Sequence, residues 1–284
     1  MPVDLAGRPI VITGASSGIG RETAIRCARR GMPVLVSARR EEKLRELVDC
    51  IEREGGRAAS VVGDVTSKDA NEEMVETCVE RFGGIYAAFA NAGYGYELPI
   101  DEQTDEQLRA IFETNFFGTM HTINAALPRL KAQREGHIVI NSSCIGLMPV
   151  PYNAAYCATK AAQHHIGRAL NTELRPFNIR CSTVHPIGTR TEFFNTAKAN
   201  SGDDAVQTEH APSWAMQPAA TVANAVVRCL RRPRPEVWTS LPIRLGICLG
   251  LLTPSLVDVF FRRYIRRREA VLEARDRDER IDQP

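Results

Sequence analysis

The chain has 284 residues, of which 44% are hydrophobic and 25% charged, which is ordinary for a folded domain. This length fits one large α/β domain or two small ones. The net charge of +2 leaves no basic excess to neutralise phosphates, so no nucleic-acid partner is expected. The eight cysteines are scattered without a Cys-x-x-Cys pair, which argues against a metal site and a disulfide framework. Because the first residues lack a basic and then an apolar segment, we expect no secretion signal and a cytoplasmic location.

The first element predicted from the sequence is a buried strand at residues 10–13, a short apolar and β-branched run. A segment with glycines at positions 14, 18 and 20 follows at once, and a helical pattern then runs to about Arg30. Glycines let a tight turn approach a phosphate, and a helix N-terminus offers free N–H groups to it. The order of strand, glycine-rich turn and helix therefore predicts a nucleotide phosphate site rather than a plain turn.

A second strand is predicted at residues 33–39, and its end carries Arg39 and Arg40. An acidic residue at this place would bind the 2′-hydroxyl of NAD(H), whereas arginine suits the 2′-phosphate of NADP(H). Two guanidinium groups are present, and the first carboxylate comes only at Glu41. The sequence therefore favours NADP(H) over NAD(H). The alternative is that both arginines merely begin the solvated helix that follows.

Two further strands are predicted at residues 58–62 and 85–90. Asp64, with Val65 beside it, follows the first of these strands and would either accept a hydrogen bond from the adenine amino group or cap a helix. Asn91, Ala92 and Gly93 follow the second strand, where the glycine lets the chain pass close to a cofactor. Strands that alternate with helices in this way predict a parallel, doubly wound sheet.

Tyr156 and Lys160 are four residues apart and follow Ser143 at a short distance in the chain. On a helix, positions i and i+4 share a face, so the ammonium group would lie beside the phenol. A phenol has an ordinary pKa of about 10, and an adjacent ammonium lowers that pKa. The three residues are therefore a candidate proton-transfer site in which the serine holds a substrate oxygen. The spacing alone also fits an ordinary surface pair on a helix.

The ordered set of motifs resembles the short-chain dehydrogenase/reductase family over about residues 5–195. The matching positions are Thr13, Gly14, Gly18, Gly20, Asp64, Asn91, Ala92, Gly93, Asn115, Ser143, Tyr156 and Lys160. The resemblance implies a single doubly wound Rossmann-like domain, here residues 1–240, with a mostly parallel seven-stranded sheet flanked by helices. It also implies an enzyme that moves a hydride between nicotinamide and a carbonyl or secondary-alcohol carbon. The expected assembly is a homodimer or homotetramer.

The resemblance assigns roles to individual residues. Tyr156 would be the general acid/base, and Lys160 would lower its pKa and bind the nicotinamide ribose. Ser143 would polarise the carbonyl, and Asn115 would support a relay water; taken alone, Asn115 would be a kink inside a helix. The implied cofactor contacts are Gly14, Ser16, Ser17, Gly18, Ile19, Gly20, Arg39, Arg40, Asp64, Val65, Asn91, Ala92, Gly93, Tyr156, Lys160, Pro186, Ile187, Thr189 and Thr191. No metal is expected.

The chain departs from the family pattern after a strand predicted at residues 180–185. The family usually has Pro-Gly there, and this chain has Pro186, Ile187 and Gly188. The backbone of Ile187 would still meet the carboxamide, with Thr191 on the pyrophosphate or amide. The Ile187 side chain would either press on the nicotinamide face or simply pack.

The substrate end of the molecule is predicted from a polar stretch at about residues 190–215, which has the character of a mobile lid. Phe193, Phe194 and Trp214 lie towards its ends. A lipophilic pocket is suggested by a further set of residues, for which core packing is the alternative: Tyr94, Tyr96, Met148, Val150 and Tyr152.

Residues 241–284 form an extension beyond the family pattern. The segment is largely apolar to about Phe261, but Arg244, Pro254 and Asp258 interrupt it. Its uncharged part is too short for a bilayer span, which needs about 20 apolar residues. Arginines follow from position 262, and then a charged tail. Such a segment would lie on an anionic membrane surface, or it would pack over the pocket or against another subunit.

The leading hypothesis is therefore an NADP(H)-dependent oxidoreductase that acts on a lipophilic carbonyl or alcohol. One alternative is a non-catalytic NADP(H)-binding sensor or scaffold, since a fold does not prove a function. Such a protein has no need of the four reacting residues together. Another alternative within the enzyme class is a 3-oxoacyl-thioester reductase, although such enzymes usually lack an extension like this one.

Overall fold

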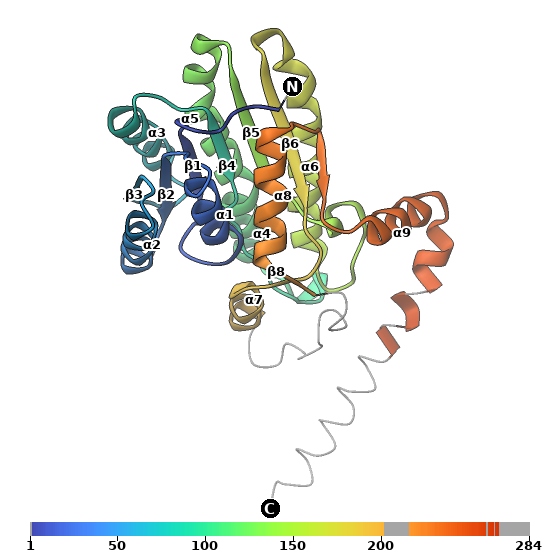
Figure 1. The fold of residues 1–284 in the computed structure, drawn as a ribbon. Helices are drawn as coiled ribbons and strands as arrows, with labels where there is room; N and C mark the ends of the chain where they lie inside the picture. Colours follow the sequence, from blue (N-terminus) through green and yellow to red (C-terminus); the bar gives the residue numbers. More distant parts are fainter. Residues whose placement is uncertain (1, 202–215, 260, 264, 267–284) are drawn as a thin grey trace, which may run out of the picture.

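The centre of the computed structural model is a seven-stranded sheet in the order β3-β2-β1-β4-β5-β6-β9, and every neighbouring pair is parallel. The structure describes residues 2–201, 216–259, 261–263, 265 and 266. The strands are β1 (Ile10–Thr13), β2 (Val34–Ala38), β3 (Ala58–Val62), β4 (Ala87–Ala90), β5 (Gly136–Asn141), β6 (Ile179–His185) and β9 (Glu236–Trp238). The doubly wound α/β sheet predicted from the sequence is confirmed (Figure 1).

Helices cover both faces of this sheet (Figure 1). One face packs against α1 (Gly18–Ala28), α2 (Glu41–Arg53) and α8 (Ala219–Arg231). The other packs against α3 (Lys68–Phe82), α5 (Gly118–Gln133) and α6 (Ala154–Glu173). Shorter helical elements connect these layers: α4 (Asp105–Phe112) and the single turns η1 (Ile100–Glu102), η2 (Glu113–Phe117), η3 (Cys144–Leu147) and η4 (Arg175–Phe177).

Successive residues of β1 pack against opposite helical layers. Ile10 and Ile12 join the core that contains α1, α2 and α8, whereas Val11 joins the core that contains α3 and α5. All three side chains are fully buried. Parallel strands covered on both faces have continuous apolar runs rather than alternation, which is why this short run forms an interior strand.

The strand order reverses at β1 and β4, and the loops that follow these two strands leave in different directions. In open parallel sheets this is where a crevice for a ligand forms, outside the carboxyl ends of the strands. Asn91, directly after β4, joins the two loops because its Nδ2 donates to the carbonyl oxygens of Thr13 (3.0 Å) and Gly14 (3.2 Å). The glycine-rich turn therefore lies at the reversal point of the sheet.

The segment after β6 leaves the sheet, and its two ends are joined by a short pair of strands. β7 (Thr189–Arg190) pairs with β8 (Gln217–Pro218), and α7 (Phe193–Ser201) lies between them in the chain. α7 is the described part of the predicted lid. Residues 202–215, including Trp214, lie outside the described residues.

The extension begins with α9 (Leu241–Leu252), and a helical segment, Pro254–Arg263, follows at an angle of 111°. Within the described part of the chain, no single helix is long and apolar enough to cross a membrane. Together the two segments have the length and composition of a bent span. The charged tail predicted at the end of the chain, from residue 267, lies outside the described residues.

Candidate active site

The glycine-rich turn after β1 needs its glycines for backbone conformation and for space. Gly14 and Gly18 have φ angles of +63° and +55°, which L side chains rarely adopt. A Cβ at Gly14 would lie 2.7 Å from the Cα of Ala92. At Gly20 it would lie 2.5 Å from the carbonyl oxygen of Gly14. Side chains at these positions would push the turn away from the loop that follows β4.

The N-terminus of α1 suits an anion. Its N-cap residue, Ser17, makes no side-chain hydrogen bond to the helix, and the first turn contains no acidic residue. The first N–H groups of a helix have no partner within the helix and carry partial positive charge. Ser16, Ser17, Gly18, Ile19 and Gly20 therefore fit a dinucleotide pyrophosphate.

Arg39 and Arg40 lie at the end of β2, where the ribose is expected. Arg39 is largely exposed, and its Nη1 lies 3.7 Å from Oδ2 of Asp64. Oδ1 of Asp64 accepts hydrogen bonds from the N and Oγ1 of Thr66, both at 3.0 Å. The helix cap itself is Ser67, so Asp64 shapes the turn rather than capping α3.

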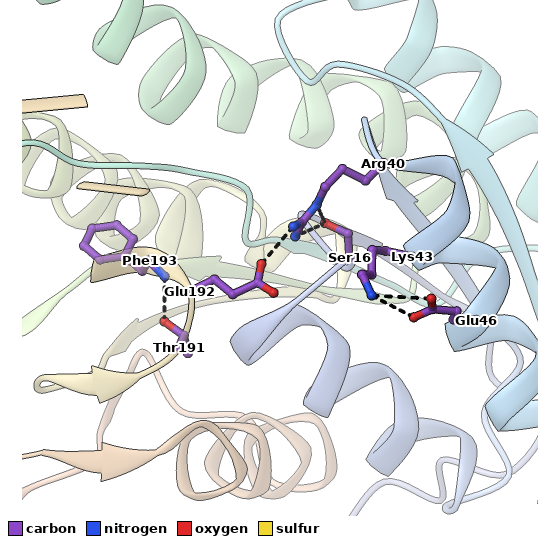
Figure 2. A network of polar contacts seen from close by, with 7 residues as sticks. All are labelled: Ser16, Arg40, Lys43, Glu46, Thr191, Glu192 and Phe193. Carbon is purple, nitrogen blue, oxygen red and sulfur yellow. Dashed lines mark hydrogen bonds and ion pairs between the residues drawn. The ribbon is translucent and has the colours of Figure 1, made fainter. Parts of the chain in front are cut away.

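Arg40 does more than begin a solvated helix. Its backbone is the N-cap of α2, but its side chain turns back across the glycine-rich turn (Figure 2). There its Nε and Nη2 donate to Oγ of Ser16 at 3.2 and 2.9 Å. The guanidinium is thus fixed between the ribose position and the turn that fits the phosphates.

The structure brings Ser143, Tyr156 and Lys160 together at the carboxyl edge of the sheet. Tyr156 and Lys160 lie one turn apart on α6, with Nζ of Lys160 5.5 Å from the centroid of the Tyr156 ring. Ser143 caps the short helix η3, which follows β5, and its hydrogen bond with the phenol favours the phenolate. The shared helix face predicted for the tyrosine and the lysine is therefore confirmed.

Burial controls the charge of this group. Lys160 is 3% exposed, and burial lowers its pKa to about 7. Burial also raises the pKa of Tyr156 above its ordinary value, and the nearby Cys144 and Cys157 act in the same direction. This is opposite to the shift expected from the lysine alone, because desolvation of the phenol outweighs the effect of an ammonium that is itself desolvated.

The ammonium of Lys160 is held by two oxygens. Its Nζ donates to the carbonyl oxygen of Asn141 at 2.8 Å and to Oε1 of Gln163 at 2.9 Å. Gln163 in turn donates from Nε2 to the carbonyl oxygen of Asn115 at 2.6 Å and to Oγ1 of Thr119 at 2.7 Å. Sequence reasoning missed Gln163, which connects Asn115 and Lys160 where the resemblance implied a water. Its position three residues after Lys160, on the same helix face, was the available signal.

Asn115 lies in η2, a π-helical turn between α4 and α5, and it is fully buried. Its Oδ1 accepts from the backbone N of Tyr94, and its Nδ2 donates to the carbonyl oxygen of Tyr94, both at 2.9 Å. The same Nδ2 donates to Oγ1 of Thr159 on α6 at 3.1 Å. π-Turns inside helices occur frequently at functional sites. Asn115 is therefore both the kink residue and the polar link between α6 and the loop after β4.

The ring of Tyr156 has apolar neighbours. Phe193, the first residue of α7, lies against it with a centroid distance of 5.4 Å. The ring also belongs to an apolar cluster whose other members are Tyr94, Tyr96, Leu98, Leu108, Ile111, Phe112 and Ala155. Of the residues predicted to line a lipophilic pocket, Tyr94 and Tyr96 belong to the cluster. Met148, Val150 and Tyr152 lie half-buried in the loop before α6.

The segment after β6 meets the glycine-rich turn. A Cβ at Gly18 would lie 3.0 Å from Cγ2 of Thr191, so Thr191 stands beside the start of α1. The backbone of Ile187 already has partners: its N donates to Oγ1 of Thr239 (3.4 Å) and its carbonyl oxygen accepts from Oγ1 of Thr189 (2.7 Å). Pro186, Ile187 and Thr189 thus lie at the expected edge of the sheet, where Ile187 is held by Thr239, the residue after β9, and by Thr189 of its own turn.

The chain belongs to the short-chain dehydrogenase family, whose family model matches residues 8–202. An uncharacterized oxidoreductase of Listeria innocua is 37% identical over 194 residues, which are 68% of this chain and 78% of that protein. An A-factor type γ-butyrolactone 1′-reductase (1S-forming) of Streptomyces virginiae is 36% identical over 190 residues, 66% of this chain and 74% of that protein.

Solved structures extend the comparison over more of the chain. A short-chain dehydrogenase/reductase from Burkholderia phymatum in complex with NAD has a TM-score of 0.80 at 25% identity, covering 89% of this chain and 96% of that one. An alcohol dehydrogenase from the archaeon Thermococcus sibiricus, complexed with 5-hydroxy-NADP, has a TM-score of 0.71 at 28% identity, covering 81% and 95%. This chain is accordingly a nicotinamide-dependent oxidoreductase of CH–OH and C=O groups. This finding favours the enzyme over the alternative of a non-catalytic sensor or scaffold.

The low pKa of Lys160 predicts how stability depends on pH. The group titrates at about 7 in the folded chain and has an ordinary value of 10.5. Between these values the unfolded chain holds a proton that the folded chain has lost, so the free energy of unfolding rises with pH. Between pH 7 and 9 we expect the wild-type chain to gain about 2 kcal/mol relative to Lys160→Met, measured by urea unfolding without added cofactor. Parallel pH profiles for the two proteins would contradict the low pKa.

Proposed function

We propose that this chain is an NADP(H)-dependent oxidoreductase that moves a hydride between nicotinamide and the carbonyl or secondary alcohol of a lipophilic substrate. One observation carries the proposal: Ser143, Tyr156 and Lys160 meet at the carboxyl edge of the sheet, and Tyr156 packs against an apolar cluster. Hydrogen bonds through Asn141 and Asn91 connect Lys160 to the glycine-rich turn. A bound nicotinamide would supply the hydride chemistry, and the protein would supply position and proton transfer.

Tyr156 is the general acid/base of this proposal. Burial keeps its phenol protonated at neutral pH, and a phenol readily protonates the much more basic alkoxide that forms when a carbonyl is reduced. Ser143 orients the substrate oxygen towards it by a hydrogen bond. Lys160 places a titrating ammonium over the face of the Tyr156 ring, and Asn115 fixes α6 against the loop that carries Tyr94.

Other residues of the carboxyl edge would hold the cofactor. The first turn of α1, with Gly14 before it, receives the pyrophosphate, and Arg39 and Arg40 receive the 2′-phosphate. Asp64 and Val65 lie towards the adenine, and Asn91, Ala92 and Gly93 pass beside the cofactor. Pro186, Ile187, Thr189 and Thr191 lie towards the nicotinamide, and Tyr156 and Lys160 towards its ribose. The two arginines and the free helix N-terminus support this assignment.

We propose residues 1–240 as the catalytic domain of a homodimer or homotetramer, and residues 241–284 as an extension that holds the protein at the inner face of a membrane. Most large apolar side chains that the described residues expose lie in this extension: Leu241, Leu245, Leu249, Leu251, Leu252, Leu256 and Val259. α9 projects from the body of the protein (Figure 1). A helix at a membrane surface buries its apolar side chains among the lipids, and Arg262, Arg263 and Arg266 suit anionic headgroups.

Removal of the phenolic hydroxyl tests the mechanism. We expect Tyr156→Phe to lower turnover about 10²- to 10⁴-fold with folding intact, because only the transferable proton is lost. NADPH absorbance would be followed with ketosteroids, retinal, quinones and acyl thioesters as substrates. Tyr86→Phe, which changes a buried tyrosine remote from Ser143, is the matched control. Unchanged turnover by Tyr156→Phe would refute the assignment.

Removal of both arginines tests the cofactor. We expect Arg39→Ala with Arg40→Ala to raise the KM for NADPH about tenfold or more, because charge-assisted hydrogen bonds to phosphate are lost. The KM for NADH should change far less. Arg45→Ala with Arg53→Ala removes the same charge from α2 and should leave both values near those of the wild type. Equal effects of the first variant on the two cofactors would show that the arginines do not bind a 2′-phosphate.

Sedimentation with vesicles tests the extension. The full chain should bind vesicles that contain phosphatidylserine better than neutral phosphatidylcholine vesicles, because arginines add electrostatic attraction to apolar contact. Replacement of Leu245, Leu249 and Leu252 by glutamine should abolish sedimentation. Val62→Gln with Ile100→Gln, which changes exposed apolar residues elsewhere, should have no effect. Equal sedimentation of all three proteins would exclude a membrane role for α9.

A further inference from the structure

The guanidinium of Arg40 contacts a carboxylate from a distant part of the chain. Its Nη1 lies 2.8 Å from Oε2 of Glu192, while Nε and Nη2 hold Ser16. Glu192 stands between Thr191, which touches the glycine-rich turn, and Phe193, which lies on the Tyr156 ring. Figure 2 shows the Glu192 side chain reaching towards Arg40 from the segment that begins α7. Each donor nitrogen of Arg40 thus has a partner within the chain.

Glu192 is an anion at neutral pH. The hydrogen bond and charge of Arg40 hold the pKa of the Glu192 carboxyl below its ordinary value, and a hydrogen bond with Ser17 acts in the same direction. The carboxylate therefore lies between Arg40 and the first residues of α1. Because about half of each side chain is exposed, the ion pair itself adds little to the stability of the fold. Its consequence lies in what else Arg40 is able to bind.

We propose that Glu192 sets the cofactor preference of this enzyme by competing with the 2′-phosphate of NADP(H) for Arg40. The inference rests on the proposed function, in which Arg40 binds that phosphate. A phosphate monoester carries a charge of about −1.5 to −2 near neutral pH, so it must displace the carboxylate from Arg40 and remain close to it. The 2′-hydroxyl of NAD(H) carries no charge, so NAD(H) neither displaces the carboxylate from Arg40 nor is repelled by it. Glu192 therefore weakens the binding of NADP(H) but not that of NAD(H). As a result, the preference for NADP(H) over NAD(H) is smaller than Arg39 and Arg40 alone would produce.

Another acidic residue nearby provides a matched control. Glu46 pairs with Lys43 on α2 at 3.0 Å, within one turn of the same helix (Figure 2). Both carboxylate oxygens of Glu46 accept hydrogen bonds from Nζ of Lys43, at 3.4 and 3.0 Å. Glu46→Gln therefore changes the net charge as Glu192→Gln does, but it leaves Arg40 and its partners in place.

The test measures binding of the cofactor rather than turnover. NADPH and NADH are titrated into the full chain, and the fluorescence of the reduced nicotinamide gives each Kd. We expect Glu192→Gln to tighten NADPH binding about two- to tenfold, as is typical when one partly exposed charge interaction is removed. NADH binding should stay within about twofold of the wild type, and Glu46→Gln should change neither Kd. In an Arg40→Gln background the effect of Glu192→Gln should largely disappear.

Three results would overturn the inference. The first is an NADPH Kd that Glu192→Gln leaves unchanged. The second is weaker NADH binding by Glu192→Gln, which would show that the carboxylate holds the ribose hydroxyls instead. The third is a full effect that persists without Arg40. If the Arg39 and Arg40 double variant selectively weakens NADPH binding while Glu192→Gln leaves it unchanged, only this inference fails. If the double variant weakens the binding of both cofactors equally, the NADP(H) assignment itself fails.

Discussion

The buried ammonium of Lys160 is the constraint on which the candidate site depends. A charge in the interior is tolerated only where it is paired or hydrogen-bonded, and here the partners are two neutral oxygens, from Asn141 and Gln163. These partners tie the end of β5 to α6, and Gln163 continues the network to Asn115 in the π-turn. Asn115 in turn holds Tyr94 and Thr159. One network therefore sets the distance between the helix that carries the tyrosine and the loop that closes its apolar side.

Burial prevents the lysine from acting as a simple electrostatic neighbour of the phenol. Desolvation lowers the pKa of Lys160 and raises that of Tyr156, so both groups move towards their neutral forms. Only the shift of Lys160 brings a titration close to neutral pH, whereas the shift of Tyr156 keeps the phenol in its protonated form. A second charge brought into this edge of the sheet, such as a phosphate or a nicotinamide ring, will change that balance.

The features that could be predicted from the sequence are those set by interactions between residues close together in the chain. β1 and β3 have the predicted bounds, and the strand expected from residue 85 begins two residues later, at Ala87. The helix face shared by Tyr156 and Lys160 was also predictable, because helical spacing is fixed by short-range geometry. Gln163 was accessible by the same rule. The Arg40–Glu192 pair was not, because the two residues are 152 positions apart and their contact depends on how the segment after β6 folds back over α1. The first carboxylate near Arg39 in the sequence is Glu41, but the carboxylate that reaches Arg40 in space is Glu192.

The extension is connected to the site by a short strand. Trp238 of β9 stacks on His185 with a centroid distance of 4.5 Å, and Nδ1 of His185 lies 3.1 Å from the carbonyl oxygen of Ser143. Thr239, the next residue, accepts from the backbone N of Ile187. α9 starts two residues later and packs against η3, the helix that Ser143 caps. The exposed leucines of α9 therefore lie on the side of the molecule that carries Ser143. In the membrane role proposed for the extension, a lipid surface bound to α9 would therefore face the same side of the molecule as Ser143.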